Sequence, residues 1–337
     1  MQRILITGTA GFIGFHLARL LLSEGFCVHG YDGLTDYYDV SLKQRRHQIL
    51  LEHENFSATI GMLQDSLLLT RVASDFQPDV IIHLAAQAGV RYSLENPRSY
   101  LDSNIVGSFN VLETGLRLNV RHLLMASTSS VYGANTTMPF DEDQKTDTPL
   151  TIYAATKKAN ETMAHAYAHL HGLHTTMFRF FTVYGPWGRP DMALFRFTDA
   201  ILDGRAIDVY NHGSMFRDFT YVDDLVKSIR LLINAIPPAP RDRTHRIQND
   251  SISPVAPFRV VNIGNSTKIR LLDFVEAIED ELGQKAKRNY MGMQPGDVPA
   301  TWADASLLLE LTGYRPNTPY REGVANFVRW YRSYYNK

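Results

Sequence analysis

The sequence predicts an α/β protein built on a doubly wound parallel sheet, with a smaller α/β domain towards the C-terminus. Short apolar, β-prone segments alternate with helical segments over the first 180 residues, a pattern typical of a parallel sheet with helices on both faces. A glycine-rich turn follows the first apolar segment directly and joins a strand to a helix. The predicted strands are residues 4–7, 26–31, 56–60, 79–84, 122–126 and 175–180.

The first turn carries Gly8, Gly11 and Gly14 at i, i+3 and i+6. We expect Gly8 to turn the chain off the strand, Gly11 to let a pyrophosphate approach, and Gly14 to let the helix pack closely. Residues 15–22 follow as an apolar helical segment, and the free N–H groups and positive dipole end at its N-terminus favour phosphate. Phe12 and Ile13 of the turn are therefore candidate cofactor contacts. A glycine triplet alone is a weak signal, but this context predicts a Rossmann-type dinucleotide site.

Asp32 supports the same prediction. It ends the second strand, close to the offset of about 20 residues expected for the acid that binds an adenosine ribose. A carboxylate would repel a 2′-phosphate, so Asp32 favours NAD over NADP. The alternative is an exposed aspartate at a strand end.

The fourth strand contains His83 and is followed by Ala85 and Ala86. Small residues here would let the backbone approach a cofactor, so Ala85 is a candidate cofactor contact. We interpret His83 as a core histidine rather than a base, because no partner is evident. Residues 37–54 are interpreted as an insertion with a polar helix near the adenosine end.

Two long helices are predicted at residues 97–118 and 152–171, and the second half of the chain is less regular. Residues 237–254 are polar and proline-rich, which predicts a surface loop prone to disorder. Further helices are expected at 194–202, 221–236, 271–282 and 322–335, and a strand that returns to the main sheet at 258–263. We predict an NAD-binding domain over 1–180, with return segments near 206–236 and 258–266, and a smaller substrate-binding domain over 181–205 and 267–337.

The composition is that of an ordinary globular protein. Hydrophobic residues make up 45% of the 337 residues, and 34 Lys and Arg balance 35 Asp and Glu. Nothing indicates a nucleic-acid surface, a membrane patch, a metal site or a membrane span. Cys27, the single cysteine, lies in a strand expected to be buried, and Met1 leads straight into the first strand. We therefore expect no signal peptide and a reducing, cytoplasmic environment.

Tyr153 and Lys157 are four residues apart on a predicted helix, so both lie on one face. A nearby ammonium and a positive nicotinamide ring would lower the pKa of the phenol and make Tyr153 a base near neutral pH. The Y-x-x-x-K pattern alone is weak. Together with the cofactor turn, and at this distance after the fifth strand, it predicts a catalytic pair.

A cluster of hydroxyl residues, 127–130, follows the fifth strand. Ligands of such sheets bind beyond the carboxyl ends of the strands, so these hydroxyls could bind a sugar oxygen. Taken alone, this cluster is better explained as a simple Ser/Thr turn.

These motifs together resemble the extended short-chain dehydrogenase/reductase family of nucleotide-sugar enzymes. They are T-G-x-x-G-x-x-G, a Ser/Thr stretch before the tyrosine, and Y-x-x-x-K. Longer and more specific stretches resemble the UDP-glucuronate 4-epimerases in particular, over nearly the whole chain. They are V-R-Y-S-L-E-N-P (90–97), F-F-T-V-Y-G-P-W-G-R-P-D-M (180–192), R-D-F-T-Y-V-D-D (217–224) and G-D-V-P-A-T-W-A-D (296–304).

The resemblance implies a role for each matching residue. Tyr153 would be the base and acid at O4, Lys157 would hold the nicotinamide ribose, and Thr128 would hydrogen-bond the 4-oxygen. Near the hexose and its carboxylate it places Ser129, Ser130, Thr182 and Arg189. Arg217 would contact the diphosphate and Asp297 the uridine ribose. It also implies a homodimer through the two long helices.

Two departures from the family pattern concern adenosine binding. The family usually has an acid at Met62, near the adenine, so a contact here must come from the backbone or from Leu63. The turn at residues 33–35 also lacks the usual asparagines.

The expected reaction is reversible inversion at C4 of UDP-glucuronate, which gives UDP-galacturonate with no net redox change. A 4,6-dehydratase would have Asp-Glu after Thr128, and a UDP-glucuronate decarboxylase would typically have asparagine in place of Thr182. A UDP-glucose 4-epimerase does not need a cation at Arg189. A non-catalytic NAD-binding regulator often lacks the tyrosine or lysine, and both are present here.

Overall fold

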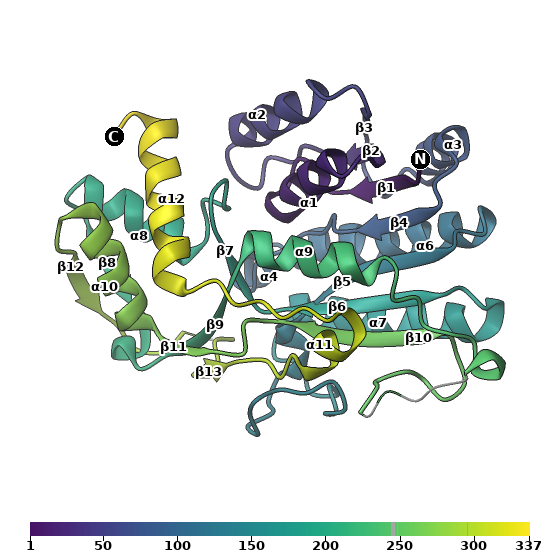
Figure 1. Ribbon diagram of the computed structural model, residues 1–337. Helices are drawn as coiled ribbons and strands as arrows, with labels where there is room; N and C mark the ends of the chain where they lie inside the picture. Colours follow the sequence, from purple (N-terminus) through teal and green to yellow (C-terminus); the bar gives the residue numbers. More distant parts are fainter. Residues whose placement is uncertain (244–246, 248, 295) are drawn as a thin grey trace.

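A seven-stranded sheet, parallel throughout, forms the centre of the molecule (Figure 1). The computed structural model describes residues 1–243, 247, 249–294 and 296–337. The strand order is β10-β6-β5-β4-β1-β2-β3, so the chain moves outward from β1 in both directions. The strands are β1 (Arg3–Thr7), β2 (Cys27–Asp32), β3 (Phe56–Ile60), β4 (Val80–His83), β5 (His122–Thr128), β6 (Thr175–Phe180) and β10 (Phe258–Ile263).

Helices cover both faces of this sheet, which confirms the doubly wound class. Successive β1 residues point to opposite faces: Ile4 and Ile6 belong to one core, and Leu5 to the other. The first core includes residues of α1 (Phe12–Ser23), α2 (Val40–Leu51), α9 (Val222–Leu232) and α11 (Ser306–Thr312). The second includes residues of α3 (Ser66–Phe76), α6 (Gly107–Arg117) and α7 (Ile152–His171).

The helix predicted over residues 97–118 is interrupted. The short helix α5 (Pro97–Tyr100) leads into a π-helical stretch, η1 (Leu101–Val106), and only then into α6. In this wider stretch the buried Asn104 pairs with both backbone groups of Gln87 and also donates to Thr156. The side chain thus ties the loop after β4 to α7. A short helix, α4 (Tyr92–Glu95), precedes α5.

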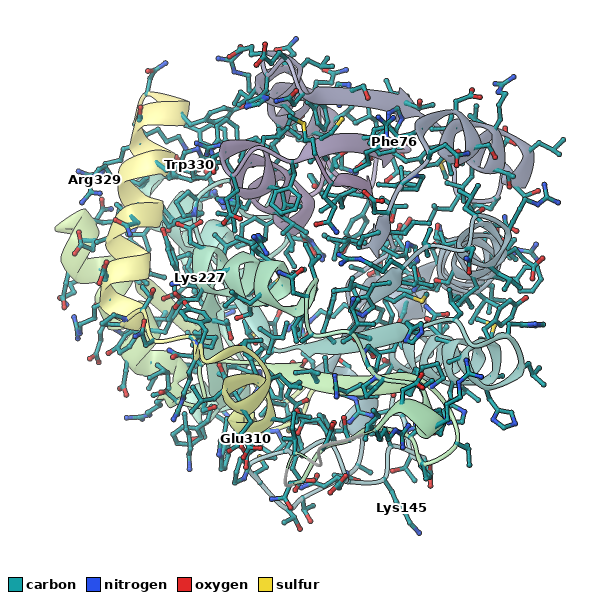
Figure 2. All side chains as sticks on the ribbon, turned by 45° about the vertical axis from the view of Figure 1, so that its right-hand side comes forward. Phe76, Lys145, Lys227, Glu310, Arg329 and Trp330 are labelled. Atoms are coloured by element: carbon teal, nitrogen blue, oxygen red, sulfur yellow. The ribbon has the colours of Figure 1, made fainter. Side chains whose placement is uncertain are left out.

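The smaller part of the molecule packs around stacked aromatic rings. Phe219 and Phe274 lie parallel with their centroids 3.8 Å apart. Figure 2 shows Trp330 on the inner side of the C-terminal helix and Arg329 on the outer side. The strands here are β7 (Thr182–Tyr184), β8 (Ala206–Val209), β9 (Phe216–Tyr221), β11 (Lys268–Arg270), β12 (Lys287–Tyr290) and β13 (Ala300–Thr301). The helices here are α8 (Ala193–Leu202), α10 (Leu271–Leu282) and α12 (Tyr320–Tyr335), with the short turn η3 (Tyr210–Gly213). Two 3₁₀ turns lie elsewhere: η2 (Ser129–Tyr132) follows β5, and η4 (Pro240–Asp242) lies between α9 and β10.

Strand pairing shows which strands of the second half of the chain join the main sheet. β10 joins the main sheet beside β6, as predicted for residues 258–263. β8 instead pairs with β12, and β9 with β7, β11 and β13, outside the main sheet. The domain limits stay a prediction.

Three expectations need comment. Cys27 is half-buried rather than buried. Residues 244–246 and 248 of the predicted loop lie outside the described residues; Ser251 of the same loop hydrogen-bonds the backbone of Val260 in β10. Every helix in the described part of the chain is too short or too polar to span a lipid bilayer.

Candidate active site

A cleft of about 1060 Å³ runs from the glycine turn, past the carboxyl ends of β1, β4 and β5, to the smaller part of the molecule. All the site residues that the sequence predicts line it, at three places. At the cofactor end lie Gly8, Gly11, Phe12, Ile13, Gly14, Asp32, Leu63 and Ala85; at the centre Thr128, Ser129, Ser130, Tyr153 and Lys157; and beyond them Thr182, Arg189, Arg217 and Asp297. The geometry of each group follows.

The glycine turn is as tight as its sequence predicts. Gly8 has a φ of +87°, and a Cβ there would lie 2.8 Å from the backbone nitrogen of Ala85. A Cβ on Gly14 would lie 2.0 Å from the carbonyl oxygen of Gly8, so its close contact is with the turn itself. Gly11 precedes α1, which has no side-chain cap and no acid in its first turn. The first N–H groups of α1 therefore face the cleft without a competing anion.

Asp32 is fixed at the rim of this turn by two backbone donors. Its Oδ2 accepts from the N–H of Ala10 at 2.9 Å, and its Oδ1 accepts from the N–H of Leu34 at 2.9 Å. Each oxygen keeps a lone pair for a further donor. The buried Leu63 lies close by and its carbonyl accepts from Asn110, while the side chain of Met62 is exposed.

The insertion after β2 reaches both parts of the cleft, not only the end where it was expected. Arg46 of this insertion donates to the carbonyl of Ala10 in the glycine turn, at 2.9 Å. Tyr37 donates its hydroxyl to Asp191, at 3.1 Å, and packs on Tyr92, so it lies in the part of the cleft that contains Arg189. No sequence signal marks this, because Tyr37 and Asp191 are 154 residues apart.

Tyr153 and Lys157 come from the first turns of α7, whose N-terminus is capped by Thr151. Burial raises the pKa of the Tyr153 phenol overall, although hydrogen bonding by Thr128 and the charge of Arg189 act to lower it. Burial lowers the pKa of Lys157 to about 8, and its Nζ donates to the carbonyl of Ala126 at 3.0 Å. The groups that oppose the effect of burial on the phenol are thus Thr128 and Arg189, whereas the sequence predicted this role for Lys157.

The hydroxyl cluster turns back on itself at the end of β5. Thr128 Oγ1 accepts from the N–H of Ser130 at 3.2 Å and donates to its Oγ at 3.3 Å. The neighbouring Ser127 is buried and donates to Glu161 at 2.6 Å. Thr128 is thus held in place next to Tyr153.

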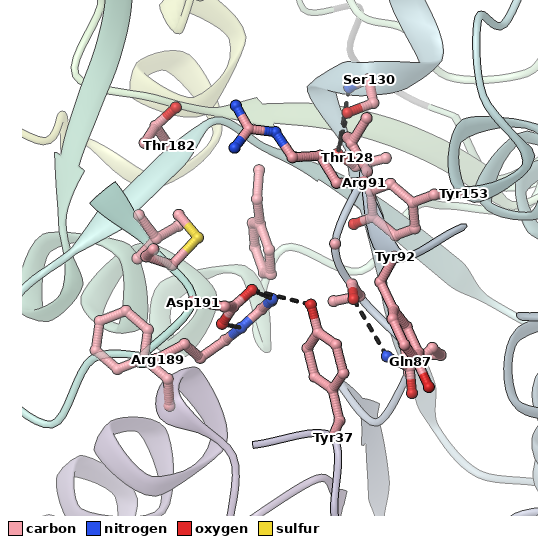
Figure 3. Close-up of a pocket in the computed structure, with 18 of the residues that line it drawn as sticks. Tyr37, Gln87, Arg91, Tyr92, Thr128, Ser130, Tyr153, Thr182, Arg189 and Asp191 are labelled. Carbon is pink, nitrogen blue, oxygen red and sulfur yellow. Dashed lines mark hydrogen bonds and ion pairs between the residues drawn. The ribbon is translucent and has the colours of Figure 1, made fainter. Parts of the chain in front are cut away.

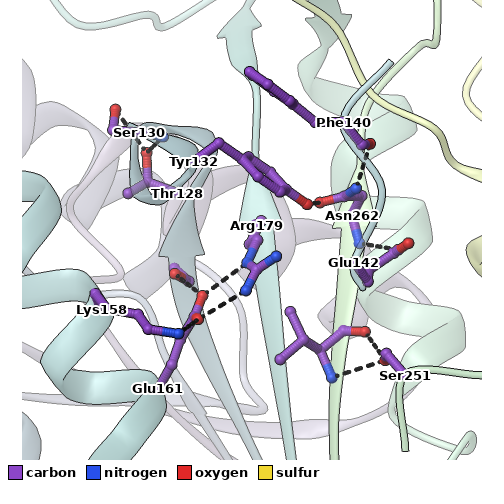
Figure 4. A network of polar contacts seen from close by, with 12 residues as sticks. Thr128, Ser130, Tyr132, Phe140, Glu142, Lys158, Glu161, Arg179, Ser251 and Asn262 are labelled. Carbon is purple, nitrogen blue, oxygen red and sulfur yellow. Dashed lines mark hydrogen bonds and ion pairs between the residues drawn. The ribbon is translucent and has the colours of Figure 1, made fainter. Parts of the chain in front are cut away.

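Behind this cluster lies a buried ion pair that sequence reasoning missed (Figure 4). Arg179 Nε and Nη2 donate to the two carboxylate oxygens of Glu161, each at 2.9 Å. The guanidinium lies 4.8 Å from the ring centroid of Tyr132, which in turn donates to Asn262 at 2.8 Å. Glu161 stands four residues after Lys157, and this spacing on α7 is the signal that could have revealed it.

His83 is a core histidine, as predicted. Its two ring nitrogens contact Thr7 at 2.7 Å and Ser108 at 2.9 Å. Burial lowers the pKa of the ring to about 3. It therefore stays neutral and structural.

The loop before α8 places Arg189 in the cleft, at the end where the resemblance predicts the hexose (Figure 3). Its Nε donates to Asp191 Oδ1 at 3.0 Å and its Nη2 to Oδ2 at 2.5 Å. The buried Arg46 donates to the carbonyls of Ala10, at 2.9 Å, and Trp187, at 2.5 Å. Arg46 thereby joins the glycine turn to the loop that carries Arg189.

Arg217 and Asp297 lie at the far end of the cleft. Burial lowers the pKa of Arg217, and the charge of Asp297 acts against this. Arg91, a cleft residue that the sequence did not single out by itself, pairs with Asp297 at 3.4 Å. It lies inside the stretch 90–97 that carried the resemblance.

Comparison with known proteins supports this arrangement. Residues 4–244 match the model of the NAD dependent epimerase/dehydratase family. The chain belongs to this family. The matched span includes the glycine turn, Tyr153, Lys157, Arg189 and Arg217, whereas Asp297 lies beyond it.

Relatives within the epimerase/dehydratase family extend the likeness over the whole chain. A probable UDP-glucuronate 4-epimerase of Rhizobium meliloti is 55% identical over 337 residues, which cover 100% of this chain and 98% of that protein. The structure of the UDP-glucuronic acid 4-epimerase from Bacillus cereus in complex with UDP-glucuronic acid and NAD matches with a TM-score of 0.87 at 29% identity, over 99% and 100% of the two chains. The Thermotoga maritima UDP-glucose 4-epimerase with UDP-glucose matches at 0.84 and 27%, over 99% and 100%.

Proposed function

We propose that this protein is an isomerase that interconverts UDP-glucuronate and UDP-galacturonate with a bound NAD. The observation that carries the proposal is the position of Arg189. It lies in the same cleft as Tyr153, Lys157 and Thr128, and close enough for its charge to lower the pKa of the Tyr153 phenol. A cation at this point suits a hexose whose C6 is a carboxylate.

The residues at the cofactor end fit a dinucleotide. Side chains at Gly8 or Gly14 would collide with backbone atoms, so the turn is built for backbone contact. The first N–H groups of α1 are placed for a pyrophosphate, and Asp32 keeps lone pairs for ribose hydroxyls. When bound, NAD would accept hydride from C4 and return it to the opposite face of the sugar.

The protein's own groups would move the proton. Tyr153 would take the proton of O4 and later return it, and Thr128 would donate to the same oxygen. Lys157, held by the Ala126 carbonyl, would keep a positive charge beneath the nicotinamide ribose. Hydroxyls of Ser129, Ser130 and Thr182 would bind the hexose.

Arg189 would have a second task. The 4-keto sugar is a β-keto acid, which loses CO₂ when the C5–C6 bond lies perpendicular to the carbonyl plane. In that step the C5–C6 bond breaks, its electron pair passes into the C4 carbonyl, CO₂ leaves, and C5 takes a proton. A guanidinium that fixes the carboxylate by two parallel bonds can keep this bond out of alignment.

The alternatives are a UDP-glucose 4-epimerase and a UDP-glucuronate decarboxylase of the same fold. The first has no sugar carboxylate to pair with the half-buried Arg189. The second is disfavoured by threonine at Thr182, where asparagine would be typical. Both reactions use the same cleft, so the product decides between them.

Purified protein incubated with UDP-glucuronate tests the proposal. We expect UDP-galacturonate to form without added cofactor, with UDP-glucose converted far more slowly. Separation of the products by chromatography and mass spectrometry identifies them. If UDP-glucose is epimerised faster than UDP-glucuronate, or if a UDP-pentose is the main product, the corresponding alternative replaces this function.

We also propose a cytoplasmic homodimer. Leu101, Val106 and Phe109 are exposed apolar side chains along η1 and α6, and Phe109 packs on Tyr167 of α7. A second copy of this surface would cover them, and the single cysteine fits a reducing compartment. Light scattering after size-exclusion chromatography would show twice the monomer mass; a monomer would contradict the proposal.

A further inference from the structure

Arg189 is the end of a short chain of polar contacts, which we call the Tyr37–Asp191–Arg189 chain (Figure 3). Arg189 donates to both oxygens of Asp191, and the Tyr37 hydroxyl donates to Asp191 Oδ2 at 3.1 Å. Tyr37 comes from the loop between β2 and α2, whereas Asp191 comes from the loop between β7 and α8. The contacts thus lock two separate loops at the sugar end of the cleft.

The geometry leaves one edge of the guanidinium free. An arginine can offer a carboxylate either its Nε and Nη2 or its Nη1 and Nη2. Asp191 occupies the first edge. Nη1 has no partner among the described residues, and Arg189 lines the cleft. A substrate carboxylate can therefore bind the second edge while Asp191 keeps the first.

The opposite charges of Asp191 and Arg189 indicate what this pair does. Asp191 cancels the charge of Arg189, so the pair attracts an anion less strongly than a lone arginine would. A site shaped for affinity alone would not contain Asp191. The pair instead restricts the direction in which Arg189 points, because two parallel bonds fix a planar group.

Tyr37 supports Asp191 from the other side. Its ring centroid lies 5.7 Å from the guanidinium carbon of Arg189 and 4.7 Å from the ring centroid of Tyr92. Burial and the charge of Asp191 raise the pKa of the Tyr37 phenol to about 12, so it remains a donor at neutral pH. A Cβ at the neighbouring Gly89 would lie 2.6 Å from the Tyr37 hydroxyl, which shows how closely this oxygen is enclosed.

We propose that Asp191 and Tyr37 are positioning residues that aim the free edge of Arg189 at the carboxylate of a hexuronate substrate. They would change the ratio of products more than the affinity for the substrate. Through Arg189 they would hold the C5–C6 bond away from the alignment that releases CO₂. This inference rests on the proposed function.

The experiment compares Asp191→Asn and Tyr37→Phe with the wild type. Asn keeps the shape of the side chain but offers Arg189 a single acceptor oxygen. We expect the fraction of turnovers that end in decarboxylated UDP-sugar to rise about tenfold in Asp191→Asn, the effect of losing one charged hydrogen bond. Tyr37→Phe should move it in the same direction by less. Mass spectrometry measures the fraction, since the product is lighter by CO₂.

Tyr92→Phe is the matched control. Tyr92 packs against the Tyr37 ring, but its hydroxyl accepts only from the exposed Asn96 among the described residues. Its product ratio should equal that of the wild type. Because Tyr37→Phe removes one atom, it tests the inference even if Asp191→Asn fails to fold.

A double-mutant cycle separates positioning from a structural role. If Asp191 acts through Arg189, Asp191→Asn should not change the product ratio further in an Arg189→Ala background. An unchanged ratio in both single variants, or an equal effect in both backgrounds, overturns the inference. If the wild type does not epimerise UDP-glucuronate, the proposed function fails first, and this inference with it.

Discussion

In the proposed function, Arg189 is the residue on which substrate choice would depend most. Arg189→Ala removes the cation that would bind the carboxylate and leaves Asp191 with Tyr37 as its side-chain donor but without a counter-charge. We expect UDP-glucuronate to bind at least about tenfold more weakly, because hydrogen bonds to charged groups contribute about 1.5–3 kcal/mol. Some turnovers should also end in a decarboxylated UDP-pentose.

Calorimetry and product analysis check this prediction. UDP-glucose, which has no carboxylate, is the control ligand, and its affinity should change little. An Arg189→Ala variant with the affinity of the wild type and UDP-galacturonate as its sole product would show that the carboxylate is held elsewhere. Arg189 would then only brace its loop through Asp191.

Tyr153 is the residue on which the proposed proton transfer at O4 would depend most. Tyr153→Phe keeps the ring that packs edge-on against Tyr100, with centroids 6.0 Å apart, and removes only the titrating oxygen. Turnover should fall by at least about 10²-fold, as for other deleted acid–base groups. The dinucleotide content and the melting temperature should stay close to those of the wild type. Near-normal turnover would remove Tyr153 from its proposed role.

Among the secondary-structure elements, β5, β6 and α7 are joined by one buried carboxylate. Glu161 of α7 contacts Ser127 of β5 and Arg179 of β6. Burial raises the pKa of Glu161, but the charge and hydrogen bonds of Arg179 outweigh this and lower it overall. The same helix carries Tyr153 and Lys157, so Glu161 helps to place both beside Thr128.

We expect Glu161→Gln to lower the free energy of unfolding by about 3–5 kcal/mol, because it leaves the buried Arg179 without its counter-charge. Denaturant titration measures the change. Glu24→Gln is the control: Glu24 pairs with Arg230 near the surface, and such pairs contribute about 0–1 kcal/mol. Equal effects of the two substitutions would contradict the role assigned to Glu161.

The elements that were predicted correctly are those whose local pattern and tertiary environment agree. The main strands are continuous apolar runs because both of their faces are buried. α3 was missed although Leu69, Ala73 and Phe76 repeat at helical spacing and are buried. β12 reads Lys-Arg-Asn-Tyr, and no apolar alternation marks such a strand. The π-helical stretch depends on Asn104 and partners distant in sequence, which the local sequence does not reveal.

The residues of the candidate site also differ in whether the local sequence could predict them. Gly8, Asp32, Tyr153 and Lys157 could be predicted to line the cleft because local spacing marks them. The contact of Tyr37 with Asp191 could not be predicted, because it depends on how two distant loops meet. Only the folded chain brings them together.

At the scale of the whole molecule, the cleft exists because two parts of the chain are held against each other. Trp187 packs between Phe15 of α1 and Trp330 of α12, with ring centroids 5.4 and 5.3 Å away. Arg46 adds the polar link from the same loop to the glycine turn. A bound dinucleotide would lie along this junction, so cofactor binding and overall stability should be coupled.

This coupling gives a prediction about the purified protein. A cycle that regenerates NAD⁺ has no need to release it, so NAD(H) should copurify with the wild type and appear in the supernatant after denaturation. Gly11→Ala should lower this content, because the new Cβ would lie 3.0 Å from the Gly8 carbonyl oxygen, in the turn that a pyrophosphate must approach. Its φ of −73° suits alanine, so the fold should survive.

Gly115→Ala is the control for this substitution. Gly115 lies inside α6, and its nearest neighbour would be 3.5 Å from a new Cβ, an ordinary contact. Its dinucleotide content should match the wild type. At a free NAD concentration 100 times the dissociation constant, binding adds about 2.7 kcal/mol of stability, so added NAD should raise the melting temperature of the stripped wild type. Recovery of NADP in place of NAD would overturn the argument from Asp32, and an unchanged content in Gly11→Ala would overturn the argument from the turn.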